Sequence, residues 1–289
     1  MSGQDRVSGA GDAHACPLCG AADVRRVVRL KTGNWVCDCR ACANGHLWPP
    51  PAVTVADYAL GRAGNDSLPL DEQEVHRSAA RRLCAFVQRR EPLAGKRLLE
   101  LGCGFGCFLE QAAQAGAQVE GLEPDPARRQ VCAARGLRVC EADAAAWSAA
   151  HAAQYDVVVM SHVLEHVPDP AALLHECRRL LKPSGRLCLA QPLHRAFLPH
   201  ALGRRWYAWL PQQHYWHFTP EGLSRFLSTC GFARDDFLHT DSYYPDPSLS
   251  AIRRPKFFLA CLVQSMVGRI GRCLRSGDQF YLSAHVTTV

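Results

Sequence analysis

The sequence predicts an α/β fold with a largely parallel sheet, preceded by a small metal-stabilised module. Apolar runs typical of buried strands alternate with helical segments over residues 97–191, and this alternation is typical of parallel βαβ units. A glycine-rich turn, Gly102-Cys103-Gly104-Phe105-Gly106, follows the first of these strands. Two Cys-x-x-Cys pairs within the first 42 residues indicate the smaller module.

The elements follow one another in a regular order. A helix over residues 71–90 has acidic residues at its start and basic residues at its end, which complements a helix dipole, and we expect it to roof a ligand site. The expected strands then cover 97–101, 117–123, 137–141, 155–161 and 185–191, and the expected helices cover 105–115, 126–134, 144–152 and 170–182. A helix over 219–230, a strand over 232–240 and an apolar stretch over 279–286 close the domain.

Composition limits the class of protein. The chain has 289 residues, of which 48% are hydrophobic and 21% charged, so it can bury a full core and is expected to hold one main domain and a smaller one. The first residues are polar and lack a secretory signal, so we expect a cytoplasmic enzyme despite fifteen cysteines. Most of these cysteines fall within predicted helices and strands, where cysteine packs as a small apolar residue.

Four cysteines have the spacing of a structural zinc site. The pairs Cys16/Cys19 and Cys39/Cys42 are separated by 19 residues, close to the spacing of a four-thiolate zinc ribbon. So short a segment buries little apolar surface, and zinc binding would supply folding energy on the order of 10–16 kcal/mol. Cys37 is an alternative to Cys39, but Cys39 keeps the pair spacing; a redox role for either pair is a further alternative.

The glycine turn indicates the kind of cofactor. Its glycines run G-x-G-x-G, and the acidic Glu100 precedes the first of them. Such an acid suits the α-ammonium group of an amino acid and would repel a pyrophosphate. A second acid, Glu123, ends the next apolar run, where it suits two ribose hydroxyls. Both acids are expected at the edge of the sheet where strands end, with Asp143 and Ser161.

These features together resemble class I S-adenosylmethionine-dependent methyltransferases. Residues 139–143, 155–167 and 180–187 resemble that family's third strand, its fourth strand with the following segment, and the turn into its fifth strand. The resemblance covers residues 75–289 and implies a seven-stranded Rossmann-like methyltransferase sheet, mostly parallel with one antiparallel strand. The implied organisation is a zinc ribbon over 1–50, a proline-containing linker over 51–74, and a methyltransferase domain with inserts near 193–218 and 242–277.

The resemblance also implies a cofactor site. Glu100 would hold the methionine end of S-adenosylmethionine, Glu123 the ribose and Asp143 the adenine. The full implied set is Glu100, Gly102, Cys103, Gly104, Gly106, Glu123, Pro124, Asp143, Ala144, Ser161 and His162.

Candidate catalytic residues follow the fourth strand. His162, Glu165 and His166 share one face if this segment is helical. A related E-x-x-E-H stretch holds a divalent metal in quinone-pathway O-methyltransferases, but here His162 replaces the first acid, which puts a Mg²⁺ site in doubt. Three alternatives remain: metal-assisted deprotonation, His166 as a general base, or a structural pairing of Glu165 with His166.

His214 is a second candidate base. It matches a histidine that methyltransferases with such a ribbon often have before the helix expected at 219–230. It can face the substrate from the first insert, or it can tie that insert to the core.

Residues 251–275 combine an apolar run with several arginines. The run is too short to span a bilayer. It could form a basic helix at a lipid surface, although a lid or a dimer-forming helix is the preferred interpretation.

The preferred function is methyl transfer to a small molecule, at a hydroxyl of an aromatic, sugar or secondary-metabolite scaffold, as in bacterial small-molecule and sugar methyltransferases. One competitor is a ribosomal RNA methyltransferase whose ribbon binds RNA, which a net charge of +6 permits. The ribbon segment lacks a dense basic stripe, however, and no N-P-P-Y-like motif follows the fourth strand, so nucleic acid is the less favoured partner. The other competitor is a non-catalytic scaffold that binds S-adenosylmethionine.

Overall fold

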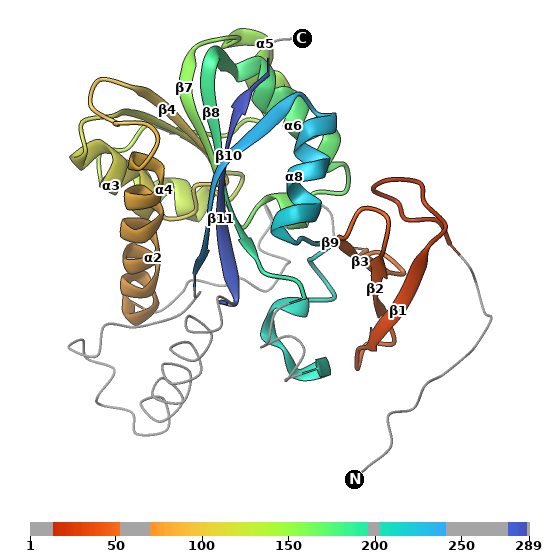
Figure 1. Cartoon of the computed structure of the whole chain (residues 1–289). Coiled ribbons are helices and arrows are strands. Elements are labelled where there is room, and N and C mark those ends of the chain that lie inside the picture. Colours follow the sequence, from red (N-terminus) through yellow and green to blue (C-terminus); the bar gives the residue numbers. More distant parts are fainter. Residues whose placement is uncertain (1–13, 53–69, 196–202, 241–276, 288–289) are drawn as a thin grey trace.

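A computed structural model describes residues 14–52, 70–195, 203–240 and 277–287. Within these ranges the chain forms a seven-stranded sheet with helices on both faces and a separate four-stranded sheet beside it (Figure 1). The linker expected at 51–74, the two inserts and the 251–275 segment lie wholly or partly outside the described residues.

The seven-stranded sheet confirms the predicted class. Its strand order is β10-β11-β8-β7-β4-β5-β6. β11 runs antiparallel to both of its neighbours, while the pairs among β8, β7, β4, β5 and β6 are parallel. The strands are β4 (Arg97–Leu101), β5 (Gln118–Leu122), β6 (Val139–Cys140), β7 (Tyr155–Ser161), β8 (Leu181–Pro192), β10 (Phe232–Thr240) and β11 (Gln279–Val286).

The helices begin where the sequence supplies caps. Asp125, Asp169 and Thr219 each accept a backbone N–H with the side chain, and each is followed by a proline in the first turn. The helices are α2 (Leu70–Gln88), α3 (Cys107–Gln114), α4 (Pro126–Ala134), α5 (Ala144–Ala150), α6 (Pro170–Leu180) and α8 (Pro220–Thr229), with short 3₁₀ turns η1 (Leu164–His166), η2 (Gly203–Arg205) and η3 (Tyr207–Trp209).

Several predicted bounds differ from the structure by one or two residues, and the largest difference lies between α6 and β8. The sequence places a helix over 170–182 and a strand over 185–191, but α6 ends at Leu180 and β8 begins directly at Leu181. Leu181 pairs with Tyr155, and the register then shifts before Arg186 pairs with Val157. The Pro183-Ser184-Gly185 turn therefore lies inside an irregular strand instead of separating a helix from a strand.

Both faces of the large sheet are buried, as expected for parallel strands. Leu99, Val158 and Met160 pack with α6 and α8 on one face, while Leu98, Val157 and Val159 pack with α2 and α3 on the other. Figure 1 shows these two helical layers on either side of the strands. In the described parts of the chain, no helix combines the length and the hydropathy that crossing a membrane requires.

The smaller sheet draws one strand from the distant insert. It consists of β1 (Val24–Arg29), β2 (Trp35–Cys39), β3 (Gly45–Trp48) and β9 (Trp216–His217), in that order and antiparallel throughout. β9 lies just before α8 and pairs with β3 at Gly45 and His46. The N-terminal ribbon and the insert therefore share one sheet.

Candidate functional site

A cavity of about 390 Å³ lies at the carboxyl ends of β4 and β7. It unites many of the residues singled out from the sequence. Those in its wall are Glu100, Gly102, Cys103, Gly104, Ser161, His162, His166 and His214. His76 and its neighbours on α2 also line it, so the helix expected to roof the site does contribute to the wall.

The glycine turn needs glycine for two separate reasons. Gly102, Gly104 and Gly106 have φ values of 67°, 55° and 73°, in the left-handed region that side chains disfavour. A Cβ on Gly102 would lie 2.6 Å from Cγ2 of Val163, whereas one on Gly104 would meet nothing within 4 Å. Gly104 therefore leaves its backbone open towards the cavity, and Gly106 packs away from it against Leu137.

Glu100 is a buried carboxyl group at the cavity wall. Its side chain is 3% exposed, and Oε2 has no hydrogen-bond partner. Burial raises its pKa well above the usual value, and the negative charges of Cys132 and Glu123 add to that effect. A cation entering the cavity would supply the missing partner, so the residue fits the ammonium group of S-adenosylmethionine.

Glu123 is held by the turn itself. Its Oε2 accepts a hydrogen bond from the backbone N–H of Gly104 at 2.7 Å, and Oε1 accepts one from Asp125 N–H at 3.1 Å. It is buried and lies outside the cavity wall. Its carboxylate therefore fixes the position of the glycine turn in this structure.

Other expected cofactor residues also lie outside the wall. Asp143 is exposed and caps α5, with Oδ1 accepting from Ala146 N–H at 2.6 Å. Pro124 and Ala144 are half-buried next to these acids. Like Gly106, these residues do not line the cavity.

The segment after β7 does not form the helix that would place His162, Glu165 and His166 on one face. Only Leu164–His166 turn, as a 3₁₀ helix, and His162 has a left-handed φ of 56°. Nδ1 of His162 lies 3.1 Å from Oε1 of Glu165. Burial alone would raise the pKa of Glu165, but the hydrogen bond and charge of His162, with the charges of His166 and His214, lower it to about 2. Glu165 thus makes a hydrogen bond with His162, and its carboxylate also interacts with the charge of His166.

The two candidate bases are neighbours. The ring centroids of His166 and His214 lie 4.5 Å apart. Nδ1 of His166 also lies 3.2 Å from the carbonyl oxygen of Gln213, 47 residues further along the chain. His214 donates from Nδ1 to the carbonyl of Ala208 at 2.9 Å, so Nε2 carries its lone pair. Burial lowers the pKa of both, that of His214 to about 3. Both rings are therefore neutral at pH 7 and able to accept a proton.

Glu165, His166 and His214 could also converge on an ion, with ligand atoms within 4.8 Å of one another. Two imidazoles and one carboxylate do not fit Mg²⁺, which prefers oxygen ligands. Mg²⁺ is therefore disfavoured at Glu165, His166 and His214, as it is at the stretch where His162 replaces the first acid.

The four ribbon cysteines do fit zinc. Cys16, Cys19, Cys39 and Cys42 have their sulfurs within 4.8 Å of one another. The Cys16–Cys42 and Cys19–Cys39 sulfur pairs are 3.9 and 3.6 Å apart. Zinc–sulfur bonds of about 2.3 Å in a tetrahedron place sulfurs roughly 3.8 Å apart. Cys39, rather than Cys37, completes the set, as its spacing indicates.

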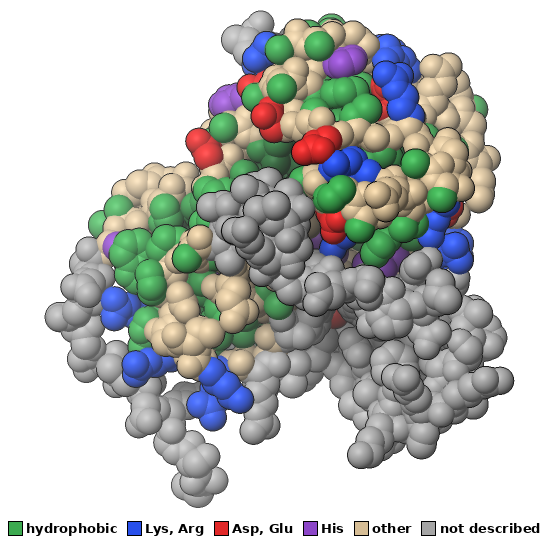
Figure 2. All heavy atoms as spheres, turned by 180° about the vertical axis from the view of Figure 1, so that it is seen from behind, with side chains coloured by type: hydrophobic (Ala, Val, Ile, Leu, Met, Phe, Trp, Pro, Cys, Tyr) green, Lys and Arg blue, Asp and Glu red, His purple; other side chains and the backbone are tan. Residues whose placement is uncertain are grey.

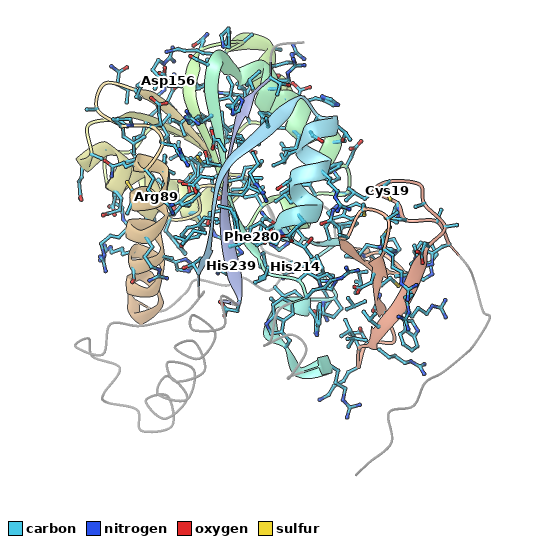
Figure 3. All side chains as sticks on the ribbon, in the orientation of Figure 1. Cys19, Arg89, Asp156, His214, His239 and Phe280 are labelled. Carbon is cyan, nitrogen blue, oxygen red and sulfur yellow. The ribbon has the colours of Figure 1, made fainter. Side chains whose placement is uncertain are left out.

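The ribbon is fastened to the wall that carries His214, which the sequence did not reveal. Leu47 N–H donates to the carbonyl of Tyr215 at 3.0 Å, and Tyr215 N–H donates to that of Glu165 at 2.8 Å. Asp38, next to a ribbon cysteine, accepts from Nε2 of His194 at 2.6 Å. Figure 3 shows His214 between the large sheet and the ribbon, and Cys19 on a ribbon loop.

The comparisons with known proteins agree with this geometry. A family model described as a methyltransferase domain matches residues 75–235. Ubiquinone biosynthesis O-methyltransferases are 39% identical over 119 residues in Klebsiella pneumoniae, covering 39% of this chain and 49% of that protein, and 39% identical over 110 residues in Marinobacter nauticus, covering 35% and 46%. The chain thus spans about half the length of the curated relatives it matches.

Solved structures share the fold. A methyltransferase from Thermotoga maritima described as a possible histamine N-methyltransferase has a TM-score of 0.54 at 18% identity, covering 80% of this chain and all of that one. A 1,6-didemethyltoxoflavin-N1-methyltransferase from Burkholderia thailandensis has a TM-score of 0.53 at 16% identity, covering 91% and 100%.

Proposed function

The chain belongs to the methyltransferase-domain family, and on that premise we propose that it transfers a methyl group from S-adenosylmethionine to a hydroxyl group of a small molecule. One observation carries the proposal. A single cavity joins the unpaired carboxyl of Glu100 and the open backbone of Gly104 to the neutral rings of His166 and His214. Cofactor-binding and proton-accepting groups thus face one space.

Three acidic residues are proposed to bind different parts of the cofactor. Glu100 binds the ammonium group, because its free oxygen is the buried acceptor at the wall. Glu123 holds the glycine turn and takes the ribose hydroxyls, and Asp143 takes the adenine amine while capping α5. S-adenosylmethionine brings its own leaving group on a sulfonium, so the protein has only to orient the acceptor and remove its proton.

His166 is the proposed general base. The carboxylate of Glu165 favours its protonated form, which stabilises the imidazolium that forms when the acceptor hydroxyl loses its proton. His214 has a lower pKa, near 3, and completes the wall beside it. His162 is occupied by its contact with Glu165.

The acceptor is proposed to be a small phenol or sugar. The relatives named for ubiquinone biosynthesis are O-methyltransferases, which favours oxygen as the methylated atom. The cavity wall combines apolar side chains such as Leu210 with the polar Gln213. On the upper part of the face seen in Figure 2, where described residues are visible, arginine and lysine side chains occur in separate groups with acidic side chains among them.

The ribbon is proposed to hold a structural zinc ion on Cys16, Cys19, Cys39 and Cys42. Four thiolates fill a tetrahedral ion, so no position remains for substrate. The ion would stabilise the sheet that β9 shares, and through it the wall that carries His214.

Methyl transfer is tested with S-adenosylmethionine carrying a labelled methyl group, supplied with small-metabolite and total-RNA fractions of the source cell. We expect label in a small organic product, and His166→Gln should reduce its formation by about 10²–10⁴-fold, as for loss of a general base. His151→Gln serves as the control, because His151 lies at the C-terminal end of α5 and does not line the cavity. Label in RNA, or cofactor binding without any transfer, would contradict the proposal.

Glu123→Ala should weaken S-adenosylmethionine binding by about 1.5–3 kcal/mol, because hydrogen bonds to a charged group are lost. Isothermal titration calorimetry measures this. Since Glu123 also holds the turn, Glu123→Gln provides the matched comparison: it keeps a carbonyl oxygen as acceptor and should lose less. An unchanged titration for the alanine variant would refute the assignment.

Cofactor affinity should depend on the protonation of Glu100. Its pKa in the free protein is raised, so part of the population is protonated at pH values above 4.5, and an ammonium group binds only the carboxylate. Affinity should therefore still rise with pH above 4.5, where an ordinary glutamate is already ionised, by at most tenfold per pH unit. Glu100→Gln should bind S-adenosylmethionine more weakly, and its affinity should lack this dependence on pH. Identical pH profiles for the two proteins would exclude the role.

Cys39→Ser should release zinc and loosen the ribbon while the seven-stranded sheet stays folded. Because the ribbon supports the wall around His214, methyl transfer should fall by about 10²-fold. The affinity for S-adenosylmethionine should change little. Metal analysis, turnover and calorimetry measure the three effects, with Cys140→Ser, on the edge strand β6, as the control. Full metal retention in Cys39→Ser would disprove the ligand set.

A further inference from the structure

A second group of metal-binding side chains lies on the ribbon sheet, apart from the four cysteines. His14, Cys37 and His46 each present one ligand atom, and the three atoms lie within 4.8 Å of one another. Cys37 is the cysteine that the zinc ribbon does not use. Nothing in the proposed methyl transfer requires this group.

The backbone brings these residues together. Cys37 on β2 and His46 on β3 are direct partners across the antiparallel pair, which places their side chains on one face of the sheet. His14 lies two residues before the first ribbon cysteine and stacks on Trp48 with ring centroids 4.0 Å apart and an angle of 9°. The stacking fixes the plane of the His14 ring over that same face.

The two histidines point ring nitrogens at each other. Nε2 of His14 lies 2.7 Å from Nε2 of His46, so one ring donates a proton to the other. Nδ1 of His46 is buried and has no partner. No hydrogen bond therefore fixes the protonation of Nδ1, and the tautomer of His46 with its proton on Nδ1 leaves the Nε2 lone pair for an ion.

The thiol of Cys37 has no good alternative partner. Its side chain is fully buried, and the hydrogen bond that it donates to the carbonyl of Trp35 is long, with the sulfur 3.9 Å from the oxygen. A hydrogen bond between the histidines accounts for two of the three groups. An ion accounts for all three, since thiolate and imidazole are the donors that zinc-class metals prefer.

We propose that His14, Cys37 and His46 form a second site for a transition-metal ion of the zinc class, which ties the segment before the first cysteine pair to the β2–β3 hairpin. Binding replaces the thiol proton, which is released to solvent, and the shared ring proton moves to a nitrogen that faces away from the ion. Two ring nitrogens on one ion lie roughly 3.3 Å apart, so the histidines separate slightly when it binds. Three protein ligands leave the fourth position to water.

Metal content per chain tests the proposal directly. Protein loaded with Zn²⁺ and then dialysed should hold two ions per chain by plasma mass spectrometry. His14→Ala and Cys37→Ala should each reduce this to one, while the controls His151→Ala and Cys140→Ala keep two. One ion in the unaltered protein that both His14→Ala and Cys37→Ala retain, or two ions that both variants retain, would overturn the proposal.

Two further measurements separate this site from the ribbon site. Cys16→Ser should remove the ion of the four-cysteine site instead. Loss of metal from that site is therefore distinguished from loss at the second site, which His14→Ala and Cys37→Ala report. With Co²⁺ in place of zinc, the absorption of thiolate-to-cobalt charge transfer should fall on Cys37→Ala while the four-thiolate contribution remains. If Cys37→Ala loses all metal because the sheet collapses, His14→Ala decides the matter, since His14 lies outside every strand.

Discussion

The pairing of β3 with β9 is the contact on which the rest of the site depends. It spans only Gly45–His217 and His46–Trp216, yet it joins the N-terminal ribbon to the chain that carries His214. Around it, Thr219 donates to the carbonyl of Ala43, and a Cβ on Gly222 would collide with Asn44. The ribbon therefore supports the chain that carries His214 from outside the cavity, without lining it. The zinc ion proposed for its cysteines would therefore stabilise a surface of the proposed active site, although none of these four cysteines lines the cavity.

Two buried carboxyl groups show how the fold separates binding from support. Glu165 has His162 as a partner, and its pKa is lowered to about 2, so it remains a fixed negative charge behind the histidines. Oε2 lacks a hydrogen-bond partner in both groups, but burial and the nearby negative charges raise the pKa of Glu100, whereas histidines lower that of Glu165. Leaving a buried carboxyl unpaired costs stability, and that cost is recovered when a cation binds beside it. Glu100 is therefore the carboxyl group that fits a cationic ligand, and Glu165 is the one that supports the neighbouring histidines.

Much of this could be predicted from local patterns. The alternation of apolar runs gave the parallel sheet, the G-x-G-x-G turn gave the left-handed backbone at Gly102, and pair spacing selected Cys39 over Cys37. Features that depend on distant contacts could not be predicted. β9 has two residues and no strand pattern of its own, and Asp38 gains its role from His194, 156 residues away. The left-handed His162 ended the supposed helix, since backbone geometry at one residue leaves no periodic signal.

The central claim is that one cavity holds the cofactor against the histidine wall. A crystal structure of the protein with S-adenosylhomocysteine tests this most directly. The account predicts the amino group of the ligand at Glu100, its ribose beside Glu123, and its sulfur facing the space in front of His166 and His214. Ligand bound elsewhere, or bound in the cavity with its sulfur directed away from both histidines, would contradict the account.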